Sequence, residues 1–328
     1  MEFCSGILKL YTPFEYILPW ARSTGFEGQS MFQIIEVQPD EWDLPEQLGT
    51  KPKFWFKNNQ FLFKEVRPGT GEDWSEKVAC ELCTLLGIPR ASYELGVWRD
   101  KRGVVSESFV ASGARLVHGN ELLTKFYPRY PARKFRGVRH HTVRIVMSIT
   151  GGLKPPIGFQ PFPGVHNATD VFVGYLMLDA WISNVDRHHE NWGLVLTEDR
   201  VVHLAPSYDH ASSLGRIETD VEKRDRLQTR DRNRDILAYV SRAKTPFYAS
   251  LKNVKPLSPL DAFLAAAVLF PQAALAWLYR LQEISDQDTE RILRDIPPDR
   301  ISETGILFAH KILVINRERL LKLVDKLM

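Results

Sequence analysis

One stretch decides the fold of this chain: Leu178-Asp179-Ala180-Trp181-Ile182-Ser183-Asn184-Val185-Asp186-Arg187-His188-His189-Glu190-Asn191-Trp192-Gly193-Leu194. The apolar run 171–182 predicts a buried helix, and the short apolar run 193–196 predicts a strand. The polar residues between them fall where a helix gives way to a strand, at the edge of a core. Side chains at such a place are held rigidly and still reach a ligand. We therefore expect a functional site here.

A second polar position follows a further apolar run. Residues 201–205 predict another strand, and Asp209 comes soon after it. Phosphoryl transfer requires a carboxylate that orients a hydroxyl and accepts its proton, together with an amide oxygen and a second carboxylate that hold Mg²⁺. Asp186 and Asn191 are five residues apart, the separation of the Asp and Asn in a protein-kinase catalytic loop. Asp209, 23 residues after Asp186, is then the second metal-binding carboxylate.

Two motifs together resemble the catalytic signature of the HipA-like serine/threonine kinases: Asn184-x-Asp186-x-His188-x-x-Asn191 and Leu204-Ala205-Pro206-x-Tyr208-Asp209. The resemblance covers residues 31–328 and is most specific over 45–110 and 170–212. It implies a two-lobed, kinase-like α+β fold with a small antiparallel-sheet lobe over 31–115 and a mainly helical lobe over 116–328. Residues 1–30 are expected to be an N-terminal extension outside this fold.

The resemblance also implies an activity, namely ATP- and Mg²⁺-dependent phosphorylation of a serine or threonine hydroxyl of a protein. Asp186 would be the catalytic base, and Asn191 with Asp209 would hold the metal. Two alternatives stay open: a kinase for a small-molecule or lipid hydroxyl, and a non-catalytic nucleotide-binding regulatory module. Asp186, His188 and His189 could also be metal ligands of a hydrolase, but no further ligand stands at a suitable spacing. His188 is expected to bond the backbone of its own loop.

The N-terminal region predicts a β-hairpin. Two aromatic-rich runs, 49–56 and 61–64, flank an Asn-Asn turn. In a kinase small lobe such a hairpin covers the phosphates, and a lysine on the following strand binds them, which would be Lys64. Related enzymes carry a serine-rich regulatory segment before this loop. Here Glu46-Gln47-Leu48 replaces it, with Thr50 nearby, so control by autophosphorylation of this loop is not expected.

A helix beginning at Glu72 or Asp73 and ending at Gly87 is expected next. Glu76 on this helix would fix Lys64 by an ion pair, and Glu81 is the rival candidate. The runs 91–98 and 103–110 predict paired strands around a turn. The second strand leads to the hinge, where backbone groups from Glu107 to Val110, including those of Phe109, would meet the adenine.

Composition limits the class of protein. The 328 residues are 44% hydrophobic and 25% charged, as in ordinary globular proteins that fold in water. A net charge of +3 is too small to indicate nucleic-acid binding, which we do not infer. No run of 18 apolar residues exists, so no membrane span is expected. The three cysteines, Cys4, Cys80 and Cys83, lack ligand partners nearby and suit free thiols in a reducing cytoplasm.

A basic stretch remains unexplained by the motifs. From Leu122 to Thr169 there is no acidic residue, yet there are eight Lys or Arg. This pattern is typical of a solvated face, and it would also suit an electrostatic guide for an acidic substrate. The expected partners are an unidentified protein substrate and, by the resemblance, an antitoxin-type protein.

Overall fold

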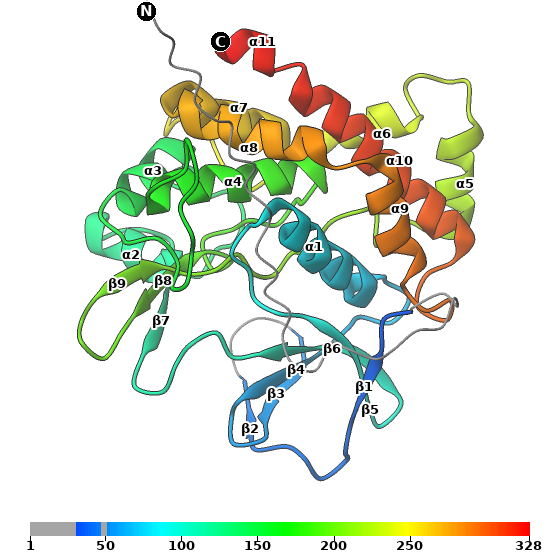
Figure 1. The fold of residues 1–328 in the computed structure, drawn as a ribbon, viewed down its shortest axis with the longest axis horizontal. Helices are drawn as coiled ribbons and strands as arrows, with labels where there is room; N and C mark the ends of the chain where they lie inside the picture. The colour runs from blue at the N-terminus through cyan, green and yellow to red at the C-terminus, as the bar shows by residue number, and fades with distance from the viewer. Residues whose placement is uncertain (1–30, 47–50) are drawn as a thin grey trace, which may run out of the picture. The chain divides into compact units, whose positions relative to one another are not determined.

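The computed structural model describes residues 31–46 and 51–328, so the predictions for residues 1–30 and for Gln47, Leu48 and Thr50 lie outside the described residues. The strands are β1 (Ile34–Val37), β2 (Leu44–Pro45), β3 (Lys53–Phe56), β4 (Phe61–Glu65), β5 (Glu94–Trp98), β6 (Lys101–Glu107), β7 (Arg115–His118), β8 (Gly193–Leu196) and β9 (Val202–Leu204). The helices are α1 (Glu72–Leu86), α2 (Gly119–Phe126), α3 (Val143–Thr150), α4 (Ala168–Trp181), α5 (Asp220–Gln228), α6 (Ile236–Arg242), α7 (Pro259–Leu269), α8 (Pro271–Glu283), α9 (Asp286–Arg294), α10 (Glu303–Leu321) and α11 (Val324–Leu327). The expected α+β fold class is confirmed (Figure 1).

The first sheet has six strands in the order β1-β5-β6-β4-β3-β2. All neighbours are antiparallel except β1 and β5, which run parallel. The predicted hairpin is β3–β4, and its turn uses positive φ angles at Lys57, Asn58 and Asn59. In this register Lys53 lies directly opposite Lys64, so the two ammonium groups share one face of the hairpin.

Helix α1 connects the first sheet to the helical part of the chain. It begins at Glu72 and ends at Gly87, whose φ of 71° caps the helix as predicted. Its apolar side chains, Trp74, Val78 and Leu82 among them, belong to the same buried core as the C-terminal helices. Figure 1 shows α1 between the sheet and helices α8 and α9, and it contacts β5, β6, α8 and α9.

Helix α4 is the centre of the helical part. All 14 of its residues are buried, because helices α3, α7, α8 and α10 pack around it. A helix that is apolar on every side is stable only inside such a core. Its first turn is closed by a reciprocal capping box between Asn167 and Asp170. The predicted buried helix over 171–182 is confirmed, and its last turn delivers the polar stretch to the core edge.

The strands that flank this polar stretch form a second sheet of order β7-β8-β9, antiparallel throughout. The chain changes from the first sheet to the second between Glu107 and Arg115. The lobe boundary near residue 115 stays a prediction. Across residues 31–46 and 51–328, no helix combines the length and the apolar character that a membrane crossing requires.

A buried carboxylate ties the first sheet to the C-terminal helices. Asp73, at the start of α1, accepts hydrogen bonds from Arg102 on β6 and from Arg300, which precedes α10. Asp73 is 0% exposed and the Arg300 side chain is 3% exposed. Because the two guanidinium groups come from segments almost 200 residues apart, this carboxylate fixes the sheet against the helical part.

Replacing Asp73 by Asn should therefore lower the free energy of unfolding by about 3–5 kcal/mol, because it leaves the buried Arg300 charge without its buried partner. Urea denaturation followed by circular dichroism measures this loss. The neighbouring Asp299→Asn is the matched control, since Asp299 is exposed and its contact with Arg300 should contribute less than about 1 kcal/mol. Equal losses in the two variants would contradict this account of Asp73.

Candidate active site

The loop after α4 is folded back on the helix that precedes it. Ser183 takes a positive φ of 55°, which reverses the chain at the helix end. Asn184 donates from its backbone to the Asp179 carbonyl (2.8 Å) and from its side chain to the Asp179 carboxylate (2.8 Å). Its Oδ1 accepts the backbone N–H of Asp186 at 3.0 Å. Asn184 thus fixes the conformation of the loop that carries Asp186.

Arg187 is the buried centre of the site. Its guanidinium forms a bidentate pair with Asp179, with two contacts of 2.8 Å, and both side chains are almost fully buried. It also donates to the carbonyls of Asn191 (2.7 Å) and Tyr208 (3.0 Å) and to Ser207 Oγ. One side chain therefore joins α4, the loop that follows it and the segment that carries Asp209. Five donors in a fixed planar fork suit this task, and a lysine could not satisfy all these acceptors.

Asp186 is partly open to solvent, with its side chain 31% exposed. Arg136 approaches its Oδ1 at 3.3 Å, and Ser212 Oγ lies 3.4 Å from Oδ2. Burial and the nearby charge of Asp209 raise the pKa of Asp186 above the ordinary aspartate value, while Arg136 and Arg216 oppose this rise. A carboxylate with a raised pKa and one open side is suited to accept a proton.

Asn191 and Asp209 are presented at the same loop. The Asn191 side-chain N–H donates to the Asp186 carbonyl at 2.7 Å, and none of the described residues donates to its Oδ1. Asp209 takes a positive φ of 58°, uncommon for a residue other than glycine, and its N–H donates to the Tyr93 hydroxyl. Backbone strain of this kind is concentrated at functional sites.

Lys64 meets Asp209 in a short ion pair of 2.6 Å. Burial by itself would raise the pKa of Asp209, but the charges of Lys64 and Lys51 and the hydrogen bond from Lys64 together outweigh burial and hold this pKa well below its usual range. In return, Asp209 keeps the pKa of Lys64 raised despite burial. Lys64, Asp186, Asn191 and Asp209, predicted from positions far apart in the chain, thus lie together.

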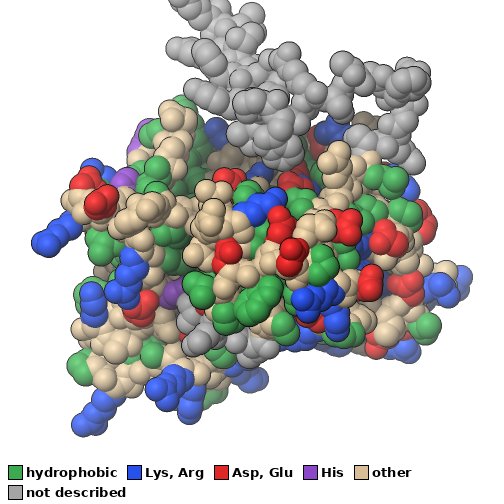
Figure 2. Space-filling model, turned by 90° about the horizontal axis from the view of Figure 1, so that it is seen from below, with side chains coloured by type: hydrophobic (Ala, Val, Ile, Leu, Met, Phe, Trp, Pro, Cys, Tyr) green, Lys and Arg blue, Asp and Glu red, His purple; other side chains and the backbone are tan. Residues whose placement is uncertain are grey.

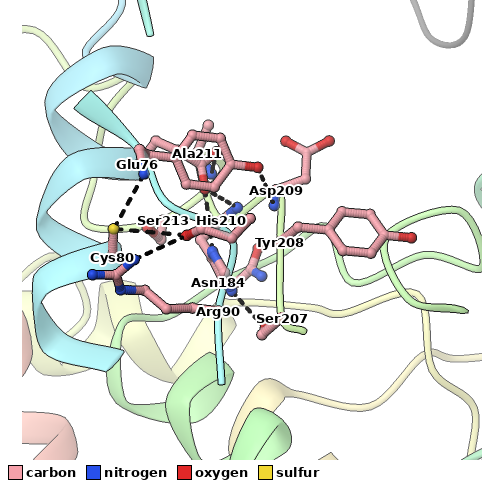
Figure 3. Close-up of polar contacts among 12 residues, drawn as sticks. Glu76, Cys80, Arg90, Asn184, Ser207, Tyr208, Asp209, His210, Ala211 and Ser213 are labelled. Carbon is pink, nitrogen blue, oxygen red and sulfur yellow. Dashed lines mark hydrogen bonds and ion pairs between the residues drawn. The ribbon is translucent and has the colours of Figure 1, made fainter. Parts of the chain in front are cut away.

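Glu76 makes different contacts from those expected. The structure shows no ion pair between Glu76 and Lys64, although both residues are described. Instead the Glu76 carboxylate accepts backbone N–H bonds from His210 (2.7 Å) and Ala211 (2.9 Å) and contacts His210 Nδ1 (3.1 Å). Figure 3 shows this arrangement, with the Asp209 carboxylate directed away from these backbone contacts. The rival Glu81 pairs with Lys77. Glu76 therefore holds the segment after Asp209, and Lys64 takes Asp209 as its partner.

Of the residues expected near an adenine, Phe109 packs against a separate apolar cluster. Phe109 stacks on Tyr208, with ring centroids 5.7 Å apart. Glu107 is an exposed residue at the end of β6, and the N–H of Ser108 is already donated to the Gln60 carbonyl. The cluster gathers side chains from both sheets and from α1: Cys80, Ala91, Tyr93, Val104, Val195, Ala205 and Tyr208, with Phe109, Ala114 and Leu116 packed against it. Apolar walls with few polar groups are typical of small-molecule sites.

Two lysines that the sequence reasoning missed stand beside Lys64. Lys51 binds Glu72 at 2.9 Å, and Lys53 lies across the hairpin from Lys64. Burial, and then the charge of Lys64, lowers the pKa of each. The signal was present in the sequence, because residues two apart on a strand point to the same face. These three ammonium groups and Asp209 influence one another, so the hairpin face gathers three lysines, two of which are paired with carboxylates.

The metal-site alternative with histidines finds no support. His188 accepts the backbone N–H of Glu190 through its Nδ1, so the predicted loop-bonding role is confirmed. His189 is paired with the Tyr130 hydroxyl at 2.6 Å. Over the described ranges, no group of three or more His, Cys, Asp or Glu side chains is arranged to hold a metal ion. The oxygens of Asn191 and Asp209 fit Mg²⁺, which prefers a few protein oxygens together with phosphate and water.

Two solved structures are similar to the chain over most of its length. The crystal structure of the Helicobacter pylori proinflammatory kinase CtkA matches with a TM-score of 0.67 and 19% identity, covering 89% of this chain and 98% of that one. HipA, in the Shewanella oneidensis MR-1 toxin–antitoxin complex with HipB and operator DNA, matches with a TM-score of 0.57 and 14% identity, covering 87% and 68%.

The chain has the HipA-like kinase fold. No protein-family model matches it, and no curated protein does. At these identities the likeness concerns the HipA-like kinase fold, and the choice of site residues rests on the geometry described above. Neither of two surface hollows, one of about 450 Å³ between α5 and α10 and one of about 480 Å³ beside the β8–β9 turn, is lined by Lys64, Asp186 or Asp209.

His141 is a buried histidine behind the loop that carries Asn191, and its burial predicts a pH dependence of stability. His141 stacks on Phe247 and its Nε2 accepts the Trp192 indole N–H, so its Nδ1 carries the proton toward the Pro246 carbonyl. Burial lowers the pKa of His141 from 6.5 to about 3. Below the unfolded value the unfolded chain binds a proton that the folded chain does not, so stability falls as pH drops through this window.

We expect the His141→Gln variant to show a flatter dependence of unfolding free energy on pH than the wild type, by up to about 1.4 kcal/mol per pH unit. Urea denaturation at about pH 7 and about pH 5 measures the two slopes. An unchanged slope in His141→Gln would exclude this histidine as a source of acid sensitivity.

Proposed function

We propose that this protein is an ATP- and Mg²⁺-dependent kinase that transfers a phosphoryl group to a serine or threonine hydroxyl of a protein. The observation that carries the proposal is the meeting of Lys64, Asp186, Asn191 and Asp209 at one place in a HipA-like kinase fold. Phosphoryl transfer depends mainly on positioning and on stabilising negative charge, and these four side chains supply both.

In this proposal the nucleotide phosphates bind at the cationic hairpin face. Lys64 is the principal phosphate ligand, with Lys51 and Lys53 beside it. Asn191 Oδ1 and the Asp209 carboxylate hold Mg²⁺, which neutralises phosphate charge when it is bound. The Lys64–Asp209 pair supports this assignment, because an ammonium and a partly exposed carboxylate that neutralise each other can both be turned toward a ligand of the opposite charge.

Asp186 orients the acceptor hydroxyl and accepts its proton. Its raised pKa makes it a better base than an ordinary aspartate, and its exposed edge leaves room for a substrate. The adenine is proposed to lie against the apolar cluster around Phe109 and Tyr208, with the backbone of Glu107 nearby. Glu76 contributes indirectly, through the backbone of His210 and Ala211.

An antitoxin-type partner is a further part of the proposal, supported by the HipA–HipB complex. The two buried free thiols, Cys80 and Cys83, suit a reducing cytoplasm, where ATP is also supplied. Affinity purification of the protein from its own cells tests the partner. Recovery of the protein alone under mild salt would contradict it.

Incubation with γ-labelled ATP and Mg²⁺, against a bacterial lysate and against the protein alone, tests the function. Label should appear on protein bands with the wild type and be lost with Asp209→Asn. ATP consumption without labelled protein would favour a small-molecule or lipid hydroxyl as acceptor. ATP binding without consumption would favour a non-catalytic nucleotide-binding module.

The role of Asp186 makes a quantitative prediction. Asp186→Asn should lower kcat by roughly 10²–10⁴-fold, because a positioned base contributes about that much. ATP affinity should change little, because the amide keeps the size of the side chain. Asp199→Asn, in the exposed β8–β9 turn, is the control and should keep wild-type turnover. Full activity in Asp186→Asn would refute the assignment of the base.

A further inference from the structure

The segment 127–142, between α2 and α3, lies against the catalytic loop. The Tyr130 hydroxyl bonds His189, and the Phe135 ring packs on His188 with centroids 4.8 Å apart. Arg136 reaches the catalytic loop directly, through the Val185 carbonyl and the Asp186 carboxylate. The inner side of this segment is therefore fixed by the loop that presents Asp186, and anything bound to its outer side is held near the site of transfer.

The outer side of this segment and of the adjoining helix ends, together segment 125–144, carries exposed basic side chains with no acidic residue among them. Its exposed cations are Lys125, Arg129, Arg133, Lys134, Arg139 and Arg144. In the described part of the chain none of these six makes an ion pair. Arg136, 64% exposed, is the exception, and its partner is Asp186 itself. Figure 2 shows Lys and Arg side chains on the side where Figure 1 has α2 and β7–β9, whereas Asp and Glu gather over the other half of that face.

A second charge-rich region of the chain behaves differently. Between Arg216 and Lys244 six acidic residues stand among nine Lys or Arg. Three of these cations form ion pairs within the region: Arg226 with Glu218, Arg234 with Asp225 and Lys223 with Asp220. An ordinary solvated face mixes both signs in this way. A group of unpaired cations beside a reaction site instead raises the local concentration of acidic ligands.

We propose that the cations of segment 125–144 bind an acidic segment of the protein substrate and so place a serine or threonine, flanked by Asp or Glu, at Asp186. This inference rests on the proposed kinase function and names its substrate class. Contacts between a basic face and an acidic peptide speed association and fix the register of binding. Arg136, at the edge of this face, is the positioning residue that connects it to the base.

A protein segment fits this face better than a single-stranded nucleic acid. Binding of single strands needs free aromatic faces on which bases stack. Here the rings of Tyr127, Tyr130 and Phe135 are used internally, against His140, His189 and His188. Phe126, at the end of α2, is the exposed exception.

Fluorescence anisotropy tests the docking step without requiring catalysis. The probes are a labelled serine peptide flanked by Asp and Glu, and its counterpart with Asn and Gln. The wild type should bind the acidic peptide at least about tenfold more tightly, and Arg133→Glu with Lys134→Glu should abolish that preference. Lys322→Glu with Lys326→Glu, an identical charge change at exposed residues near the C terminus, should keep it.

Equal binding of the two peptides, or equal loss in the two double variants, would overturn the proposal. Tighter binding of a single-stranded RNA of matched charge, weakened by the Arg133 and Lys134 changes, would overturn it in favour of nucleic acid.

Phosphorylation of the same peptides with γ-labelled ATP separates this inference from the proposed function. Support requires that kcat/KM for the acidic peptide fall about tenfold in the Arg133 and Lys134 double variant, while kcat at saturating peptide is kept. If no peptide or protein is labelled by the wild type, the kinase function fails and the choice of phosphorylated substrate falls with it. A kcat/KM that does not distinguish the two peptides, in an active enzyme, overturns the substrate class alone.

Discussion

The site depends on one buried ion pair, between Arg187 and Asp179. A guanidinium that is fully removed from water is stable only if nearly all its donors are satisfied. Here they are satisfied by α4, by the loop that follows it and by the segment before Asp209. A shift of the loop or of the segment before Asp209 would leave buried guanidinium N–H donors unsatisfied. The pair therefore sets the separation of Asp186 from Asp209, and with it the distance between the proposed base and the proposed metal ligand.

Acidic residues at the N-terminal end of α1 impose a second constraint on how the segments of the site are placed. Glu72 binds Lys51, Arg67 and Arg216, Asp73 binds two arginines, and Glu76 accepts the backbone after Asp209. Acidic side chains are favourable at a helix N-terminus, and each of these also fixes a different part of the chain. One end of α1 thereby bonds to four parts of the protein: the hairpin, the first sheet, the segment after Asp209 and the C-terminal helices. Movement of that end would displace Lys51 and the segment after Asp209 together.

The pairing of charges differs between the centre of the site and the outer side of segment 125–144. At the centre, lysines and carboxylates neutralise each other, as in the Lys64–Asp209 and Lys51–Glu72 pairs. Under the proposed function, a phosphate or a metal ion replaces one partner of such a pair. On the outer side of segment 125–144 the cations have no internal partner. A neutralised centre keeps the fold stable without a nucleotide. Unpaired cations on the surface cost little free energy, because water solvates them, and they remain available to another molecule.

The amino-acid sequence alone determined the local features of this protein. The apolar run of α4, the Asn-Asn hairpin turn and the glycine at the end of α1 follow from short-range preferences, and the spacing of Asp186, Asn191 and Asp209 indicated the site. Tertiary structure alone decided which charge meets which. Glu76 was expected to bind Lys64 and binds the backbone after Asp209 instead, and the burial of Arg187 has no local signal. Ion pairing depends on which distant segments meet and how much water they exclude, and those are properties of the packed chain.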